Sequence, residues 1–155
     1  MGADPLAAKA LLEDMGREVQ LALEETGKLA HRIYPPLLEA GGLGAALRAA
    51  AVSADVPTRI EVATETRYPP EIAGAVYFCC LEVLERAGQG ARATIDVRVE
   101  DDVVRFEIAE HSATTLGDAV GKVRDRVEAL GGWLTLESEP GRRGTHVSGS
   151  LPLAR

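Results

Sequence analysis

Two residues of opposite charge, Glu82 and Arg86, stand four positions apart in the segment YFCCLEVLERAGQGARAT. On a helix this spacing places the carboxylate and the guanidinium one turn apart on the same face. One interpretation is an ion pair that stabilises the helix by about 0.3–0.5 kcal/mol. The other is a direct phosphate contact, because a guanidinium offers paired N–H donors to phosphate. A guanidinium has only donors, so Arg86 cannot serve as a ligand for a hard cation such as Mg²⁺.

The histidines and cysteines predict no further reactive cluster. His31, His111 and His146 are widely spaced, without the cysteine or carboxylate pattern of a metal site, and no Ser–His–Asp arrangement can be picked out. Cys79 and Cys80 are neighbours on a predicted helix and point about 100° apart, which suits neither a disulfide nor a metal clamp. We expect both to pack in the core of a protein kept in a reducing cytoplasm.

The composition indicates a soluble globular protein. Its 155 residues suffice for one compact domain and an extra element, with 46% hydrophobic and 26% charged residues. A formal net charge of −7 argues against nucleic acid or an anionic membrane as a partner. No apolar run reaches the roughly 18–20 residues that cross a bilayer, so no membrane span is expected in this segment.

A long helix is predicted from Leu6 to Ile33, a stretch without proline that Pro35-Pro36 brings to an end. Its apolar positions alternate in steps of three and four, as in a heptad seam: Leu12, Met15, Val19, Ala22, Thr26, Leu29 and Ile33. The seam favours pairing with another helix of a bundle or with a partner chain. A single amphipathic helix lying on its own domain would give a similar stripe.

The rest of the chain predicts an α+β fold of two layers, a sheet with helices on one face. Hydrophobic periodicity and the glycine and proline positions predict these elements in order: a helix over 43–54, a strand over 58–64, a helix over 70–87, strands over 93–99 and 103–109, a helix over 116–130, and strands over 133–137 and 145–151. Asp101-Asp102 predicts a tight turn between the two central strands.

Three segments in this order resemble sensor histidine kinases of the nitrate-sensor type. LAHRIYPPLLEAGGLGAALRAA resembles the end of their second dimerisation helix and the linker, and YPPEIAGAVYFCCLEVLERAGQGARAT resembles the helix that carries the N box. DRVEALGGWLTLESEPGRRGTHVSGSLPL is similar to the final helix and hairpin of their ATP-binding domain. The resemblance covers about Ala10 to Leu153. It implies the histidine-kinase-like ATPase (Bergerat or GHKL) fold of gyrase and heat-shock-90, with residues 1–36 as dimerisation-helix-like segment and linker and residues 37–155 as ATP-binding domain.

The resemblance also implies the positions of a nucleotide site, and several are altered. The family's N box reads Glu-x-x-x-Asn, and its Asn ligates the Mg²⁺ that bridges the ATP phosphates. Glu82 stands at the catalytic Glu position, and Arg86 replaces the Asn. The second box, Asp-x-Gly-x-Gly, binds adenine through its Asp; Glu110 stands there, and Ser112 and Thr114 replace the two glycines.

Two further elements complete the implied site. The family's lid-side Gly-Leu-x-Gly element falls at Ala119-Val120-Gly121-Lys122, which lacks the paired glycines. The backbone cradle that glycines give to phosphate is therefore expected to be lost. Gly144-Thr145 matches the family's Gly-Thr at the start of the last strand. The family's phosphoacceptor His lies on the first dimerisation helix, outside this segment, and His31 does not match it.

Three hypotheses follow from the resemblance and its departures. The first is a degenerate ATP-binding module with a dimerising or regulatory role in a bacterial two-component sensor, without Mg-ATP or another cofactor. The second is a working kinase domain that uses ATP and Mg²⁺ to phosphorylate a His outside this segment. The third is an anti-sigma-like protein-interaction domain. Expected partners are a second copy, through the N-terminal helix, and a response regulator or partner kinase. The expected location is the cytoplasm, alone or as the cytoplasmic part of a membrane-anchored sensor.

Overall fold

The computed structural model describes residues 5–32, 36–63, 67–112, 121–138 and 144–153. The chain divides into two units, Met1–Pro35 and Pro36–Arg155. The first unit contains helix α1, Pro5–Arg32, which agrees with the long helix predicted there. Its seam residues Leu12, Met15 and Val19 are exposed. The seam positions from Thr26 onward lie outside the side chains that the structure describes.

The second unit is a five-stranded sheet with three helices. In chain order its elements are α2 (Pro36–Ser53), β1 (Thr58–Val62), α3 (Pro70–Arg86), β2 (Arg92–Glu100), β3 (Val103–His111), α4 (Gly121–Ala129), β4 (Trp133–Glu137) and β5 (Thr145–Pro152). The strand order is β1-β2-β3-β5-β4, in which only the β1–β2 pair is parallel. Among the described residues, no helix combines the length and apolar character needed to cross a membrane.

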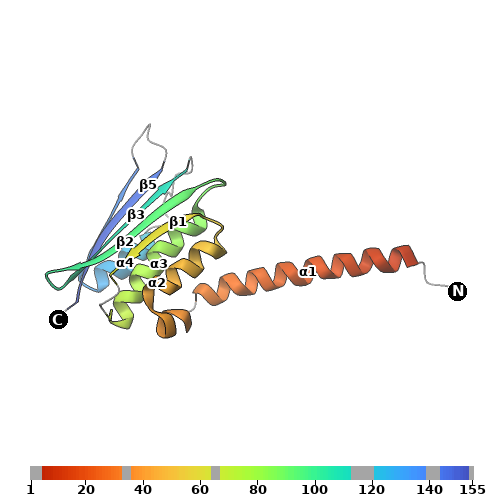
Figure 1. The fold of residues 1–155 in the computed structure, drawn as a ribbon, viewed down its shortest axis with the longest axis horizontal. Coiled ribbons are helices and arrows are strands. Elements are labelled where there is room, and N and C mark those ends of the chain that lie inside the picture. Colours follow the sequence, from red (N-terminus) through yellow and green to blue (C-terminus); the bar gives the residue numbers. More distant parts are fainter. Residues whose placement is uncertain (1–4, 33–35, 64–66, 113–120, 139–143, 154–155) are drawn as a thin grey trace. The chain divides into compact units, whose positions relative to one another are not determined.

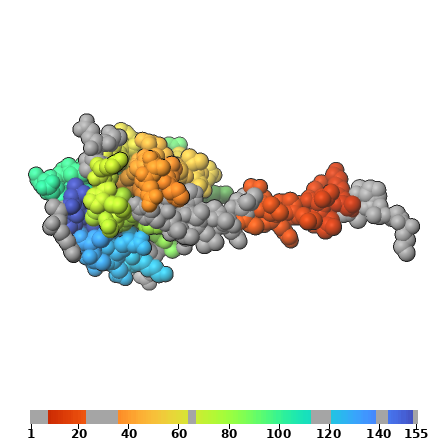
Figure 2. Space-filling model, turned by 90° about the horizontal axis from the view of Figure 1, so that it is seen from below, coloured from red at the N-terminus to blue at the C-terminus, as the bar shows by residue number. Residues whose placement is uncertain are grey.

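The three helices of the second unit cover one face of the sheet (Figure 1). Burial alternates along the central strands, so every second side chain of β2 and β3 points into the core, as the period of a half-buried strand requires. Figure 2 shows α2, α3 and α4 side by side as the helical layer. The predicted α+β two-layer architecture is confirmed.

Several element boundaries differ from the prediction, and β1 ends at Val62, two residues early. Helix α2 begins at Pro36 instead of residue 43, and it is interrupted by a kink at Gly42 (φ 77°, ψ 177°), a conformation open only to glycine. Strand β3 continues to His111, because pairing with β2 extends to the Arg92–His111 pair. Helix α4 is described only from Gly121, so residues 116–120 of the predicted helix lie outside the described residues.

The turn between β2 and β3 has the predicted tight geometry. Asp101 and Asp102 both adopt left-handed conformations, with φ of 51° and 58°. Two successive residues with positive φ match the twist of an antiparallel pair, and aspartate tolerates that conformation better than most residues. The backbone N–H of Leu153 donates to the carbonyl oxygen of Asp102 at 2.8 Å, which ties the end of the chain to this turn.

Close packing of β5 on β3 depends on one glycine. Gly149 pairs with Phe106 in the β3–β5 register, and both residues face the core. A Cβ at position 149 would lie 2.3 Å from Cζ of the Phe106 ring, so the ring occupies the space that a side chain would need. The aromatic ring fills the centre of the core because its partner has no side chain.

We therefore expect Gly149→Ala to lower the free energy of unfolding by about 1–3 kcal/mol, the usual cost of overpacking a core. Ser148→Ala is the matched control, because Ser148 is the neighbouring residue and points to the opposite, partly exposed face. Urea denaturation followed by circular dichroism measures both. A Gly149→Ala protein as stable as the wild type would contradict this packing.

Candidate functional site

The Glu82–Arg86 pair forms on α3 as the spacing predicts. Nε of Arg86 donates to Oε2 of Glu82 at 3.2 Å, near the C-terminus of the helix. The Arg86 side chain is 49% exposed and that of Glu82 is 28% exposed, so the pair lies at the edge of the helical layer. An exposed i, i+4 pair contributes only a few tenths of a kcal/mol. The pair also has a chemical consequence, because the guanidinium of Arg86 engages a carboxylate that would otherwise be available to a ligand.

The face of α3 that carries this pair turns toward α4. Phe78 precedes Glu82 by one helical turn, and the guanidinium of Arg126, on α4, lies 4.7 Å above the centre of the Phe78 ring. Such a contact between a cation and an aromatic face contributes about 0.5–1 kcal/mol at an exposed site. Phe78, Glu82 and Arg86 therefore form a line along the α4 side of α3.

A second polar pair, Glu110 and Thr145, lies beneath the helices. Glu110 on β3 is paired directly with Thr145 on β5 and with Ala93 on β2. Glu110 is 2% exposed and Thr145 is 3% exposed. Oε1 of Glu110 and Oγ1 of Thr145 are buried without a hydrogen-bond partner among the described residues. The sequence prediction ended this strand at residue 109 and placed Glu110 and His111 after it. That prediction is wrong, because both residues belong to β3.

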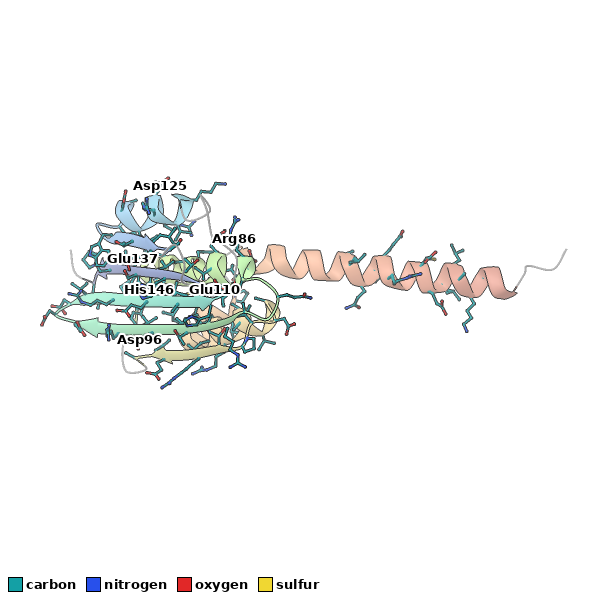
Figure 3. The ribbon with its side chains drawn as sticks, turned by 90° about the horizontal axis from the view of Figure 1, so that it is seen from above. Arg86, Asp96, Glu110, Asp125, Glu137 and His146 are labelled. Carbon is teal, nitrogen blue, oxygen red and sulfur yellow. The ribbon has the colours of Figure 1, made fainter. Side chains whose placement is uncertain are left out.

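Arg86 and Glu110 lie at the same end of the sheet (Figure 3). The end of α3 at Arg86 leads within a few residues to the start of β2, whose Ala93 is the register partner of Glu110. Helix α3 contacts β3 and α4 contacts β4, so β5, which lies between these strands, passes beneath the junction of the two helices. The structure thus brings four of the predicted site residues, Glu82, Arg86, Glu110 and Thr145, to one region.

Gly144 is required for the close approach of β5 to Glu110. It has φ of 134°, which disfavours any residue with a side chain, and a Cβ there would lie 2.2 Å from the carbonyl oxygen of Glu110. The glycine of the predicted Gly-Thr pair therefore has a physical role, since it lets the chain enter β5 with Thr145 directly opposite Glu110.

The other predicted site residues are not shown to contact Glu82, Arg86, Glu110 or Thr145. Ser112 is half-buried and follows the end of β3. Gly121 is exposed at the first residue of α4, with open space around it, so this structure shows no close approach that requires a glycine there. Thr114, Ala119 and Val120 lie outside the described residues, as do the side chain of His31 and the loop over 139–143.

The two cysteines lie in the core, as predicted. Burial raises the pKa of Cys79 to about 12, with a smaller contribution from the charge of Glu82. Burial also raises the pKa of Cys80 well above its usual value, and the Cys79 thiol adds to the shift. A thiol with such a pKa stays protonated at neutral pH, so neither cysteine is a nucleophile or metal ligand here.

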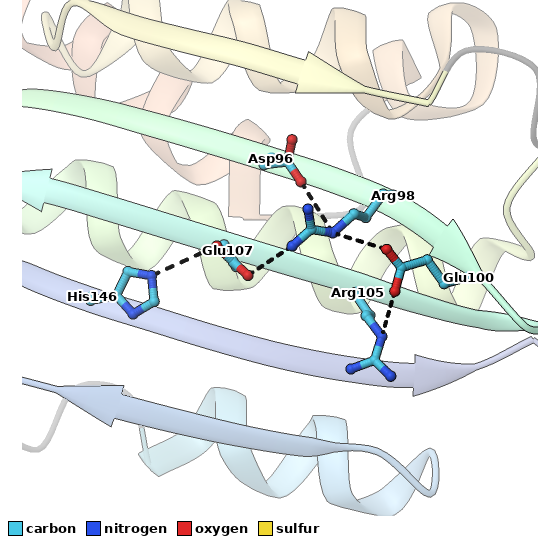
Figure 4. Close-up of polar contacts among 6 residues, drawn as sticks. All are labelled: Asp96, Arg98, Glu100, Arg105, Glu107 and His146. Atoms are coloured by element: carbon cyan, nitrogen blue, oxygen red, sulfur yellow. Dashed lines mark hydrogen bonds and ion pairs between the residues drawn. The ribbon is translucent and has the colours of Figure 1, made fainter.

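The helix-free face of the sheet carries an ion-pair network that the sequence did not reveal (Figure 4). Charges alternate along β2 and along β3 in five members, and a histidine of β5 borders them: Asp96, Arg98, Glu100, Arg105 and Glu107, with His146. Nη2 of Arg98 lies 2.9 Å from Oε1 of Glu107, and Nε2 of His146 lies 4.0 Å from Oε2 of the same glutamate. The members are roughly half exposed, so we interpret the network as support for strand pairing. Among the described residues, no three His, Cys, Asp or Glu side chains form a metal-binding group.

The unpartnered hydroxyl predicts an unusual response to mutation at Thr145. An unsatisfied buried polar atom costs about 1–3 kcal/mol, and valine has nearly the same shape as threonine without the hydroxyl. We expect Thr145→Val to keep or raise the free energy of unfolding, by about 1 kcal/mol. Thr135→Val on β4 is the control, because Thr135 is exposed. A marked loss of stability in Thr145→Val alone, measured by urea denaturation, would show that the hydroxyl has a structural partner.

Comparison with known proteins agrees with this architecture. The chain is 28% identical over 163 aligned positions to the sensor histidine kinase NarS of Mycobacterium tuberculosis, an alignment that covers 92% of this chain and 38% of NarS. The chain therefore spans less than half the length of this relative. No protein-family model matches the sequence.

Solved histidine kinases share the fold. The histidine kinase domain of the blue-light activated kinase from Erythrobacter litoralis EL346 superposes with a TM-score of 0.58 and 21% identity, covering 72% of this chain and 61% of that one. The histidine kinase AdeS of Acinetobacter baumannii gives a TM-score of 0.53 and 12% identity, covering 100% of this chain and 88% of AdeS. The chain is thus similar in sequence to a sensor histidine kinase, and its second unit shares the fold of solved histidine kinase domains.

Proposed function

We propose that this chain is a regulatory, dimerising module of a two-component sensor histidine kinase, whose ATPase domain does not carry out Mg-ATP phosphotransfer. The contact between Arg86 and Glu82 is the observation that supports this most directly. It joins the two N-box positions that, by resemblance, would hold the metal and assist the attacking histidine. We propose a cytoplasmic location for this segment, with a response regulator or a partner kinase as its signalling partner.

The electrostatics of α3 oppose a magnesium ion at this place. Mg²⁺ demands oxygen ligands in near-octahedral geometry, and Arg86 supplies none. The permanent charge of the guanidinium also repels a divalent cation, while the carboxylate of Glu82 is engaged with Arg86 at 3.2 Å. Phosphoryl transfer relies on positioning and on neutralising the phosphate charge, so displacing the metal removes much of the catalytic power.

A second candidate, a working kinase domain, is favoured by one specific observation. Glu110 and Thr145 remain as a buried carboxylate and hydroxyl at the position where the family binds adenine. Buried polar atoms without partners are costly, so the two such atoms at these positions favour a role in contacting a ligand. By resemblance, the residues at the adenine-binding positions therefore match the family's chemistry better than the residue at the metal-binding position does.

Magnesium dependence distinguishes the two candidates. A ligand at about 100 times its dissociation constant stabilises a folded protein by about 2.7 kcal/mol. For this chain we expect no saturable rise in Tm that depends on Mg²⁺ when a non-hydrolysable ATP analogue is titrated. A clear rise with Mg²⁺ over EDTA would contradict the proposal and favour the working kinase.

Arg86→Asn is the companion variant for this titration. It removes the cation and restores the residue type that the family uses to ligate the metal. A gain of Mg²⁺-dependent stabilisation would locate the block at this one position. No gain would indicate that the replaced glycines of the second box, Ser112 and Thr114, also prevent binding.

The dimerising role is proposed from the exposed seam of α1. Leu12, Met15 and Val19 are all more than half exposed at heptad spacing, which leaves an apolar stripe that a second helix could cover. By its resemblance to a dimerisation helix, the occupant that we propose is a second copy of the chain.

We expect Leu12→Glu to weaken the dimer at least tenfold, because it places a charge in the seam. Leu21→Glu is the matched control: Leu21 is a similarly exposed leucine of α1 that lies off the seam. Light scattering during size-exclusion chromatography measures the mass of each variant over a concentration series. A monomeric wild type, or an equal effect of both variants, would contradict pairing through the seam.

A further inference from the structure

Charged side chains on the helix-free face of the sheet lie in two neighbouring rows that run across the strands (Figure 4). In the first row, Arg98 on β2 is the register partner of Arg105 on β3. In the second row, Asp96 is the partner of Glu107, and Glu61 on β1 is the partner of Asp96. Directly opposite residues share one face of a sheet, so a cationic row lies beside an acidic row.

Within one chain, the members of each row repel each other, because they are direct cross-strand partners of like charge. Diagonal contacts between the rows offset this repulsion. Nη2 of Arg98 lies 2.9 Å from Oε1 of Glu107, and Nε of Arg105 lies 3.1 Å from Oε2 of Glu100. These four side chains are still about half exposed, so each can contact an opposite charge from outside the sheet.

Uncharged side chains continue both rows toward the β4 edge. Ser150 on β5 is the register partner of Arg105 and of Trp133, so the first row ends in a tryptophan that is 47% exposed. Ser148 and Thr135 continue the second row in the same way. Tryptophan is among the residue types that most often anchor protein interfaces. The face therefore combines a patterned charged half with an exposed aromatic side chain.

The two rows complement each other when a second sheet is placed face to face with the first. A two-fold axis in the plane between the sheets, across the strands and midway between the rows, sets each cationic row over an acidic row. Arg105 then faces the partner's Glu107, and Arg98 faces the partner's Asp96. Such a self-complementary patch is what a two-fold dimer requires. Sheets packed face to face keep their strands within about 30° of each other, so both rows meet together.

We propose that the helix-free face is an interface through which a second copy of this chain binds, sheet against sheet. The charge pattern favours a second copy, because a wholly acidic or wholly basic partner would meet one row of its own sign. Five strands spaced about 4.8 Å apart offer roughly 600 Å² per copy, at the lower end of specific interfaces. The interface uses other residues than the seam of α1, so it does not depend on the proposed function.

Charge-swap variants of the full chain test this interface. Each variant also carries Leu12→Glu, which suppresses pairing through α1. Arg105→Glu and Glu107→Arg should each weaken association at least about tenfold, because each sets like charges against each other in both symmetry-related contacts. An equimolar mixture of the two should regain this loss, because the exchanged charges then face each other across the interface. Sedimentation equilibrium over a concentration series measures all three samples.

Arg59→Glu and Glu61→Arg on β1 are the matched control. They make the same charge changes, at the same two-residue spacing and on the same face of the sheet. The two-fold axis does not bring position 59 of one copy over position 61 of the other, so mixing these two variants should restore nothing.

The single tryptophan of the chain gives a readout without charge changes on the sheet. Pairing covers Trp133, so the fluorescence emission of the Leu12→Glu chain should shift to shorter wavelength as its concentration rises. This measurement applies even if a charge-swap variant does not fold.

The outcomes separate this inference from the proposed function. A Leu12→Glu chain that stays monomeric up to millimolar concentration, without a shift in emission, would overturn the inference and leave the proposed function standing. So would a mixture of Arg105→Glu and Glu107→Arg that associates no more tightly than either alone, or equal recovery in the β1 control mixture. Association that Leu12→Glu leaves unchanged but Arg105→Glu weakens would support the inference and contradict the dimerising role of α1.

Discussion

The pairing of β5 with β3 is the constraint on which both the core and the candidate site depend. Near the middle of β5, Gly149 leaves room for the Phe106 ring, and just before the strand begins, Gly144 lets the backbone pass against the carbonyl of Glu110. Both contacts require the absence of a side chain on β5. The register that they fix sets Thr145 opposite Glu110. The strand pairing that fills the core therefore also determines which buried polar side chains lie opposite each other.

The site is asymmetric in its chemistry. Its deep end holds a carboxylate and a hydroxyl among apolar neighbours, where an unpaired polar atom is expensive and a matching ligand is strongly selected. Its outer end holds an ion pair in contact with water, where the same charges are worth little to stability. On the function that we propose, the ion pair would oppose a metal ion while adding little to the stability of the domain. The helix-free face carries more ion pairs, and there too one polar atom, Oδ1 of Asp96, is buried without a hydrogen-bond partner among the described residues, 3.7 Å from Nε of Arg98.

The sequence predicted those features that arise from short-range spacing. The order of strands and helices, the Asp101-Asp102 turn and the Glu82–Arg86 contact all depend on residues close together in the chain. Features that depend on strand register could not be predicted. The contact of His146 with Glu107 joins different strands, and the burial of Glu110 follows from pairing that extends β3 beyond its predicted end. The kink in α2 was not predicted either, because Gly41-Gly42 has the sequence of an ordinary helix boundary.

The kink at Gly42 has a mechanical consequence. Leu38 and Leu47 are nine residues apart, so on an unbroken helix, at about 100° per residue, they would project to opposite sides. Both are nonetheless buried, because the break at Gly42 redirects the first turn of α2. The polypeptide that arrives from residue 35 is thus anchored in the interior within three residues by Leu38. A rotation of the backbone at the start of α2 would therefore displace side chains that are packed in the interior of the second unit.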